Sequence, residues 1–390
     1  MGCACLPILA GDGVTKVILS ANTDWYLYNF RLSLSKAIRS SGVDLLLASP
    51  LGPYVSRIKE EGLRWRELPM SRRGFAPSGE MAALLRFFAL YSSERPDLVH
   101  HFTIKPVLYG SLAARWARIL AVVNSITGLG YVFVNPGKPA ALLRPVVRRL
   151  YRSALAGSRV RVIFQNARQR EQFLREGLAD AERSVVIPGS GVDPERYRPR
   201  PEPSGEPVVL MAGRMLWDKG IGELVAAARL LRQQGVQVRF VLVGAVDDGN
   251  PASVPEKQLC AWQEEGVVRW LGHQDDMPEV LGKCHIVALP SYGEGIPKAL
   301  IEAAAAGKPI VATDVAGCRD VVQDGVNGLL VAPRDVEQLA GAIRRLASDA
   351  SLRGRMGEAG RARVLKEFAD EHINRETLWV YRELLPDGFG

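Results

Sequence analysis

The segment HIVALPSYGEGIPKALIEAAAAG, residues 285–307, carries a strand, a loop and a helix in succession. Its first part is apolar and β-branched, which predicts a short buried strand ended by proline and glycine. Pro297 suits the first position of a helix, and Gly307 suits the cap after its last turn. Glu294 is therefore expected in the loop and Glu302 in the second turn of a buried helix. Carboxylates in such places need partners, and the neighbouring sequence supplies none.

Strands alternate with helices along the rest of the chain in the same way, which predicts an α/β fold with doubly wound parallel sheets. Residues 194–207 interrupt the alternation with five prolines and a glycine, as a linker does. We expect an N-terminal domain over 1–195, a C-terminal domain over 196–367, and a helix over 368–390 that crosses back to the first domain. A cleft should lie between the carboxyl ends of the two sheets. The expected strands are 15–20, 44–49, 97–102, 121–126, 161–166, 184–189, 207–214, 238–244, 267–272, 285–291, 309–314 and 328–332.

A second segment, GRMLWDKG at residues 213–220, also follows a strand and opens a helix. Arg214 and Lys219 flank its loop. Helix N-termini bind anions, and two nearby cations suit a diphosphate without requiring a metal. If this loop meets the one that bears Glu294 and Glu302, the ligand should combine a diphosphate with hydroxyl-rich rings, because carboxylates accept hydrogen bonds from hydroxyls. A nucleotide-sugar has both parts.

The composition is that of a soluble protein: 390 residues, 47% hydrophobic and 24% charged. No apolar run is long enough to span a bilayer, and the start of the chain does not resemble a secretory signal. The five cysteines are scattered, which favours a reduced, cytoplasmic setting and no metal site. No aromatic stacking motif accompanies the basic residues, so nucleic acid is not an expected partner.

Positive charge is concentrated in the first half of the chain. No acidic residue lies between Asp97 and Glu171, whereas twelve basic residues do. Residues 145–155 place Arg148, Arg149 and Arg152 off an apolar stripe, which predicts a basic amphipathic helix. Such a helix attracts an anionic membrane, or it simply covers the sheet with a polar face that happens to be basic.

Taken together, the motifs resemble the retaining glycosyltransferases of family four, which have the GT-B fold of two Rossmann-like domains facing across a cleft. The resemblance covers nearly the whole chain, and its most specific part is the pair of glutamates with seven residues between them. The motifs that carry it are Gly213-Arg214, Lys219-Gly220, Pro290-Ser291, Glu294-Gly295-Ile296-Pro297, Glu302-Ala303, Gly307-Lys308-Pro309 and Asp324-Gly325-Val326-Asn327-Gly328.

The resemblance assigns expected roles to these positions. Glu294 would contact hydroxyls of the transferred sugar, while Arg214 and Lys219 would neutralise the diphosphate; these three form the expected catalytic set. Glu302 would hold the ribose. No metal or other cofactor is expected. The donor-binding set implied by the resemblance is Glu302, Gly295, Ile296, Pro297, Lys298 and His273.

Several further segments are similar to a subgroup that acts on bacterial surface polysaccharides. Relatives of this kind often move an N-acetylhexosamine from a uridine diphosphate carrier onto an undecaprenyl-diphosphate-linked saccharide, which would place this chain on the inner face of the membrane. The first loop, SANTDW at residues 20–25, departs from the family pattern because it lacks paired glycines. The family's domain-one histidine also has no single counterpart here, since two histidines are adjacent. The acceptor-side candidates are Asn29, Arg31, His101, Thr103, Lys105 and Gly128.

Two other functions are compatible with the same features. A non-hydrolysing sugar-nucleotide epimerase shares the architecture, and product analysis without an acceptor would distinguish it. A non-catalytic nucleotide-sugar-binding protein is the second alternative. A nicotinamide oxidoreductase is disfavoured, because residues 20–25 lack the glycine fingerprint that such an enzyme carries after its first strand.

Overall fold

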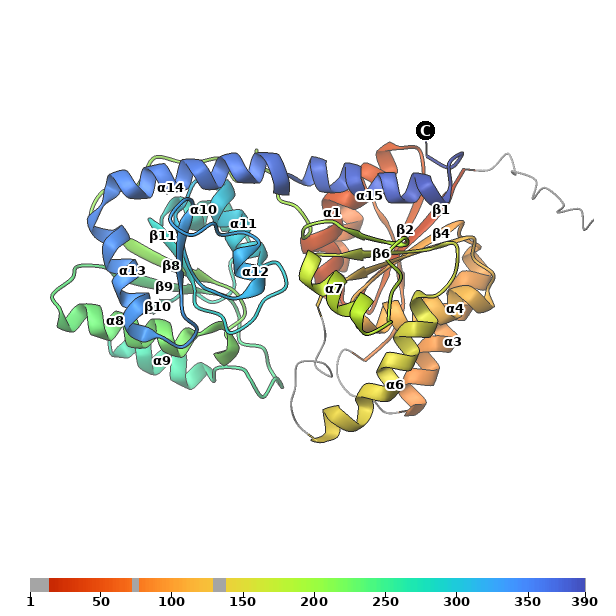
Figure 1. The fold of residues 1–390 in the computed structure, drawn as a ribbon, viewed down its shortest axis with the longest axis horizontal. Coiled ribbons are helices and arrows are strands. Elements are labelled where there is room, and N and C mark those ends of the chain that lie inside the picture. Colours follow the sequence, from red (N-terminus) through yellow and green to blue (C-terminus); the bar gives the residue numbers. More distant parts are fainter. Residues whose placement is uncertain (1–13, 72–76, 129–137, 390) are drawn as a thin grey trace, which may run out of the picture.

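The computed structural model describes residues 14–71, 77–128 and 138–389, which form two parallel α/β domains (Figure 1). The seven-stranded sheet of the first domain has the order β3-β2-β1-β4-β5-β6-β7, and the six-stranded sheet of the second has the order β10-β9-β8-β11-β12-β13. The predicted fold class is confirmed. The strands are β1 (Lys16–Ser20), β2 (Asp44–Ser49), β3 (Arg64–Glu67), β4 (Leu98–Phe102), β5 (Ala121–Ile126), β6 (Val160–Phe164), β7 (Ser184–Val186), β8 (Val208–Ala212), β9 (Arg239–Val243), β10 (Arg269–Trp270), β11 (Ile286–Leu289), β12 (Ile310–Thr313) and β13 (Gly328–Val331).

Strand β3 is the one strand of the described chain that the sequence did not predict. Its sequence, RWRE, has three exposed residues and therefore lacks the apolar alternation that marks a strand. It forms the edge of the first sheet, where Arg64 pairs with Asp44 of β2 at 2.5 Å. A charged, exposed edge of this kind also protects the sheet from pairing with another chain.

Helices cover both faces of each sheet. In the first domain they are α1 (Asp24–Ser40), α2 (Val55–Glu60), α3 (Pro77–Glu94), η1 (Pro106–Gly110), α4 (Ser111–Trp116), α6 (Lys138–Leu155) and α7 (Ala167–Arg175). In the second they are η2 (Trp217–Lys219), α8 (Ile221–Gln233), α9 (Glu256–Glu264), α10 (Met277–Gly282), α11 (Lys298–Ala305), α12 (Ala316–Arg319), α13 (Val336–Ser348), α14 (Ala350–Arg363), η3 (Val364–Phe368) and α15 (Asp370–Leu384).

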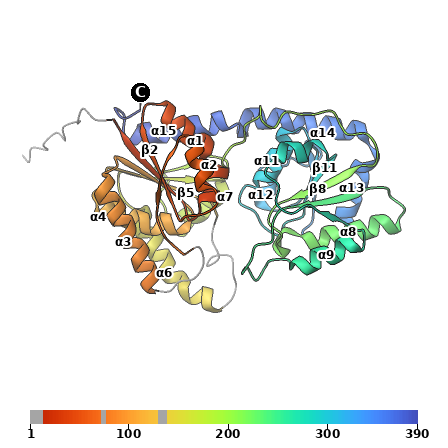
Figure 2. The same ribbon diagram turned by 180° about the vertical axis from the view of Figure 1, so that it is seen from behind.

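The C-terminal helices connect the two domains. Helix α14 packs against the second domain, and α15 lies along the first beside α1 (Figures 1 and 2). Between them Val192 and Ala369 form a β-bridge, so the chain passes between the domains twice at the same place. A hydrogen bond of 2.5 Å joins the buried Tyr381 hydroxyl of α15 to His100 of β4. The last helix is thereby fixed to the first domain's core.

The basic amphipathic segment 145–155 is the second part of α6. Val147, Tyr151 and Leu155 are buried in the first domain, so most of its apolar stripe faces the protein, although Val146 is 57% exposed. Arg148 pairs with Glu176 at 2.9 Å, just beyond α7. Of the two interpretations of this segment, the structure favours the helix that covers the sheet.

Candidate active site

Two loops of the second domain meet at the carboxyl ends of β8 and β11. Gly220 has a φ of +74°, and a Cβ atom there would lie 2.1 Å from the carbonyl oxygen of Pro290. Only glycine permits both this conformation and this close approach. The backbone N–H of Tyr292 donates to the Asp218 carbonyl at 2.9 Å, and the Ser291 hydroxyl donates to the same carbonyl at 3.1 Å. The GRMLWDKG and SYGEG loops are therefore held against each other.

This arrangement brings Lys219 and Glu294 together. The Lys219 ammonium donates to Glu294 Oε1 at 2.5 Å, and the two side chains are 22% and 10% exposed. They are 75 residues apart in the sequence. Lys219 thus supplies the partner that Glu294 lacks in its own segment. The pair remains accessible to solvent from the lysine side.

Arg214 follows β8 and its guanidinium donates to Asp247 at 2.7 Å. The arginine side chain is 48% exposed and the aspartate only 7%. Two further hydrogen bonds hold the turn around Asp247. The Asn250 side-chain amide donates to the Asp247 carboxylate at 2.9 Å, and the Asp247 N–H donates to the Ser253 hydroxyl at 3.1 Å. Asp247 was not identified from the sequence, because it lies in a polar turn with no apolar pattern around it.

Glu302 lies in the second turn of α11, as predicted, and Pro297 is the residue before the helix rather than its first residue. The Tyr197 hydroxyl donates to Glu302 Oε1 at 2.9 Å, and the Lys298 ammonium lies 3.9 Å from the same oxygen. Burial raises the pKa of Glu302, and Lys298 and Tyr197 act in the opposite direction. Tyr197 comes from the linker, where nothing in the sequence marked it as part of a site.

Lys298 connects this helix to the first domain. Its ammonium donates to the Asn29 carbonyl of α1 and lies 4.9 Å from the centre of the Phe30 ring. Burial lowers the pKa of Lys298, with Glu302 acting to raise it. Lys298, expected on the donor side, therefore contacts Asn29, which was expected on the acceptor side.

Three other donor-side residues also face the first domain. A Cβ at Gly295 would lie 3.0 Å from Oε1 of Gln165 in the first domain. Ile296 Cγ2 would lie 3.4 Å from a Cβ at Gly189, which also belongs to the first domain. Gly295 and Ile296 therefore both lie close to the first domain. His273 is half exposed, and its Nε2 lies 3.2 Å from the Tyr54 hydroxyl. The donor-side loops are thus built against the first domain.

An ion pair near His273 forms a further bridge between the domains. Arg57 of α2 donates to both oxygens of Asp275 at 2.9 Å. Hydrogen bonding from Arg57 lowers the pKa of Asp275 to about 2. Both partners are largely exposed, with 40% and 57% of their side chains accessible, so the bridge directs the approach of the domains more than it stabilises them.

The structure buries His101 completely within the first domain. Its imidazole is fully buried and hydrogen bonded to Tyr91 at 2.8 Å and to Asn124 at 2.9 Å. Burial lowers the pKa of His101 to about 4, so the ring is neutral at physiological pH. Its ring nitrogens are hydrogen bonded to core residues in this arrangement, and its acceptor-side role stays a prediction.

The remaining acceptor-side candidates occupy varied environments. Arg31 is buried, lies 4.3 Å above the Phe102 ring and donates to the Tyr26 hydroxyl at 2.8 Å. Lys105 pairs with Glu80 at 2.5 Å and is only 9% exposed. Thr103 has a φ of +68°, a strained value at the end of β4, and its hydroxyl accepts from the Asn22 N–H at 3.2 Å. A Cβ at Gly128 would meet open space.

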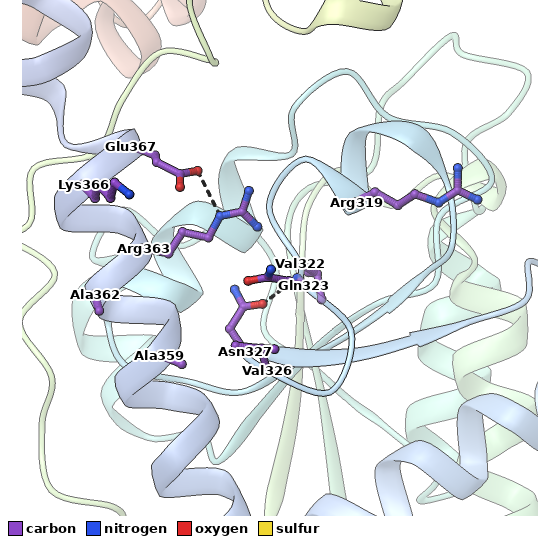
Figure 3. A pocket seen from close by; sticks show the side chains of 10 residues that line it. All are labelled: Arg319, Val322, Gln323, Val326, Asn327, Ala359, Ala362, Arg363, Lys366 and Glu367. Carbon is purple, nitrogen blue, oxygen red and sulfur yellow. Dashed lines mark hydrogen bonds and ion pairs between the residues drawn. The ribbon is translucent and has the colours of Figure 1, made fainter.

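A hollow of about 490 Å³ lies elsewhere on the second domain, between η3 and the turn before β13 (Figure 3). Arg363 lines it, but its guanidinium is engaged by Glu367 and by the carbonyls of Val321 and Asp320. None of the predicted site residues lines this hollow. Among the described residues, no group of three or more His, Cys, Asp or Glu side chains is placed to hold a metal ion.

Family models match both domains. The model for glycosyl transferases group 1 matches residues 193–363, and the model for glycosyl transferase 4-like domains matches residues 16–166. A D-inositol 3-phosphate glycosyltransferase of Nocardia farcinica is 31% identical over 76% of this chain and 68% of its own. The N,N'-diacetylbacillosaminyl-diphospho-undecaprenol alpha-1,3-N-acetylgalactosaminyltransferase of Campylobacter jejuni is 29% identical over 84% of this chain and 88% of its own.

Solved structures show the same architecture. The crystal structure of Anabaena HepE in complex with UDP and glucose superimposes with a TM-score of 0.76 at 22% identity, covering 94% of this chain and 99% of HepE. A sucrose-phosphate synthase from Thermosynechococcus elongatus superimposes with a TM-score of 0.78 at 22% identity, over 95% and 99% of the two chains. These likenesses establish the GT-B fold.

Proposed function

Because this chain belongs to the group 1 glycosyltransferases, we propose that it is a retaining enzyme that moves a sugar from a UDP-linked donor to an undecaprenyl-diphosphate-linked saccharide. The observation that carries the proposal is the Lys219–Glu294 pair. The pair sets the cation that we propose to bind the diphosphate beside the carboxylate that we propose to bind sugar hydroxyls, at the meeting point of two loops. A nucleotide-sugar presents its diphosphate next to its sugar in the same way.

The donor side of the proposal rests on chemistry at the ends of two helices. The free amides at the start of α8 and α11 favour anions. Arg214 and Lys219 are paired with Asp247 and Glu294, and both cations would turn toward the diphosphate when the donor binds. Glu302 would accept hydrogen bonds from the ribose and Glu294 from the sugar. UDP is the proposed nucleotide, because HepE was solved with UDP and glucose.

Catalysis would consist mainly of electrostatic stabilisation. As the bond between sugar and diphosphate breaks, negative charge grows on the leaving diphosphate, where Arg214 and Lys219 would stabilise it. The acceptor hydroxyl would attack from the face that the diphosphate leaves, and the leaving phosphate would take its proton. Two side-chain cations can serve this step without a metal, so we expect turnover to persist in a chelating buffer.

The acceptor side is proposed from the relatives and from the charge of the first domain. The Campylobacter jejuni relative is named for an undecaprenol-linked diphospho acceptor. A lipid-linked acceptor lies in an anionic membrane, and the basic stretch between Asp97 and Glu171 suits such a surface. We therefore place the enzyme at the inner face of the membrane, as a peripheral protein. In the described part of the chain, no helix is both long and apolar enough to cross a bilayer.

The proposal is tested with a panel of nucleotide-sugars. UDP-N-acetylhexosamines and UDP-hexoses should raise the melting temperature, since a ligand that binds the folded state stabilises it by mass action. Transfer to an undecaprenyl-diphosphate-linked saccharide should follow with retained configuration at the sugar carbon. An altered sugar formed without any acceptor would indicate the epimerase instead. Stabilisation by a nucleotide-sugar with neither product would indicate a non-catalytic binding protein.

A further inference from the structure

Four large apolar side chains are exposed together on α3 and α4 of the first domain. Met81 is 54% exposed, Leu85 53%, Phe88 37% and Trp116 55%. The three on α3 are spaced so that they share one face of the helix. The rings of Phe88 and Trp116 meet edge to face, with centroids 6.5 Å apart. We call these four side chains the α3–α4 ridge.

The ridge is not the part of α3 that forms the core. Leu84, Phe87, Leu90 and Tyr91 lie on an adjoining side of the helix and are buried beneath the sheet. Helix α3 is thus apolar on two sides, and only one of them has a partner in the described structure. A second apolar side that remains exposed to solvent indicates that this side binds an apolar or interfacial partner.

The charge around the ridge favours a negatively charged partner. The acids of α3 are already paired, Glu80 with Lys105 and Glu94 with Arg66. Arg115, the neighbour of Trp116 in α4, lines a hollow of about 310 Å³ together with Arg118 and Arg159, and no acidic residue of the described chain lines it. The Arg115 guanidinium donates to the Ser153 and Ala156 carbonyls, so Arg118 and Arg159 are the arginines of this set that we expect to meet a phosphate. An indole next to a set of arginines is the combination found where proteins meet lipid headgroups.

The basic helix that the sequence suggested for this role is turned the other way. In α6, Val147 and Tyr151 face the core, and Arg148 is held by Glu176. The ridge lies on the same side of the sheet as α6, and α15 covers the other side (Figures 1 and 2). Docking through the ridge would leave the helices that link the domains free in solvent.

We propose that the α3–α4 ridge inserts into the headgroup region of an anionic phospholipid bilayer, with the arginine-lined hollow beside it receiving a lipid phosphate. The exposed apolar side chains and the basic lining of the hollow, to which no described acidic residue contributes, specify the partner surface. This inference builds on the proposed function, since a lipid-linked acceptor would bring the enzyme to such a surface. It locates the contact on α3 and α4 and not on the basic stripe of α6.

The test is flotation of the full chain with vesicles. Vesicles with about one third phosphatidylglycerol in phosphatidylcholine should bind the protein, pure phosphatidylcholine vesicles should bind it far less, and added salt should weaken binding. A double variant, Phe88→Ser with Trp116→Ser, should lose about tenfold or more in partitioning, because it removes two large interfacial side chains. Trp379→Ser is the matched control, since Trp379 is 52% exposed but lies on α15; it should bind as the parent does.

Three results would overturn the proposal. The first is unchanged vesicle binding by the double variant, and the second is an equal loss in Trp379→Ser. The third is a dimer in sedimentation that the double variant abolishes, which would assign the ridge to a second copy of the chain. Circular dichroism and the melting shift with UDP report whether the double variant is folded. Sugar transfer to a detergent-solubilised acceptor is measured separately, so failure of the enzymatic proposal is distinguishable from failure of membrane docking.

Discussion

Replacing Lys298 with methionine tests whether the affinity for the nucleotide depends on contact between the domains. Methionine keeps most of the apolar stem and removes the charge. The change deletes the hydrogen bond to the Asn29 carbonyl, the cation above the Phe30 ring at 4.9 Å and the charge 3.9 Å from Glu302. A charge-assisted hydrogen bond contributes ~1.5–3 kcal/mol and a cation over an aromatic ring ~0.5–1 kcal/mol.

Part of this loss is offset, because burying an ammonium costs desolvation free energy and burying a methionine side chain does not. Burial lowers the pKa of Lys298, which is the sign of that cost. With the lysine side chain 25% exposed, solvent also screens the interaction with Glu302. We therefore expect a net loss of about 1–2 kcal/mol in nucleotide binding, equivalent to roughly 5- to 30-fold in affinity.

The pH dependence of the variant gives a sharper readout than the affinity alone. Glu302 must be ionised to accept two hydroxyl donors, so nucleotide affinity should fall as the pH drops through its pKa. That pKa is already raised above 4.5 by burial, and Lys298 opposes the rise. Removing the lysine should raise it further and move the fall in affinity to higher pH.

Titration calorimetry with UDP across a pH series measures both effects. Lys283→Met is the control, because that lysine is 74% exposed and pairs with Glu279 on the surface of the same domain. Equal affinity and an identical pH profile for Lys298→Met and the parent would refute the reasoning. So would an equal change in the control.

Three further changes test separate parts of the structure. Lys219→Ala should lower turnover about 10²-fold or more, which is the scale of losing one electrostatic stabiliser. Unchanged steady-state kinetics with the donor would contradict this role. Gly220→Ala should unfold at lower temperature than Gly235→Ala; both glycines have a φ of +74°, but only at Gly220 would the new Cβ meet an atom within 4 Å. Tyr381→Phe should cost ~1 kcal/mol in denaturant unfolding, since His100 loses a buried partner; an unchanged midpoint would show that this bond does not hold α15.

The strand, loop and helix around Glu294 were predictable because each is specified locally. An apolar β-branched run, a proline and a glycine define β11, the start of α11 and its end without reference to the rest of the chain. The partners of the two glutamates were not predictable in this way. Tyr197 is 105 residues from Glu302, and a hydroxyl in a proline-rich linker carries no periodic signal of its own.

The domain-one candidates show a different limit. The family resemblance made His101 an acceptor-side candidate, within an expected strand over residues 97–102. Alternation along β4 does not reveal which way each ring turns when both adjacent histidines are buried, and the structure binds His101 to Tyr91 and Asn124. In the same way, the stripe of α6 was visible in the sequence, but its direction depended on packing against Phe173 of α7. The catalytic, donor-binding and acceptor-side roles stay predictions.

The Lys219–Glu294 pair also bears on how product leaves the site. A complete donor would satisfy both ions at once, its diphosphate on Lys219 and its sugar hydroxyls on Glu294. After transfer, UDP retains only the first contact, and Glu294 competes with it for the ammonium. Glu294→Gln removes that competition, so UDP should bind about 5- to 30-fold more tightly while turnover falls, given ~1–2 kcal/mol for a partly exposed ion pair of good geometry. Glu265→Gln, which breaks the surface pair with Arg229, is the control. Weaker UDP binding by Glu294→Gln in calorimetry would mean that the glutamate holds Lys219 in place for the diphosphate and does not compete with it.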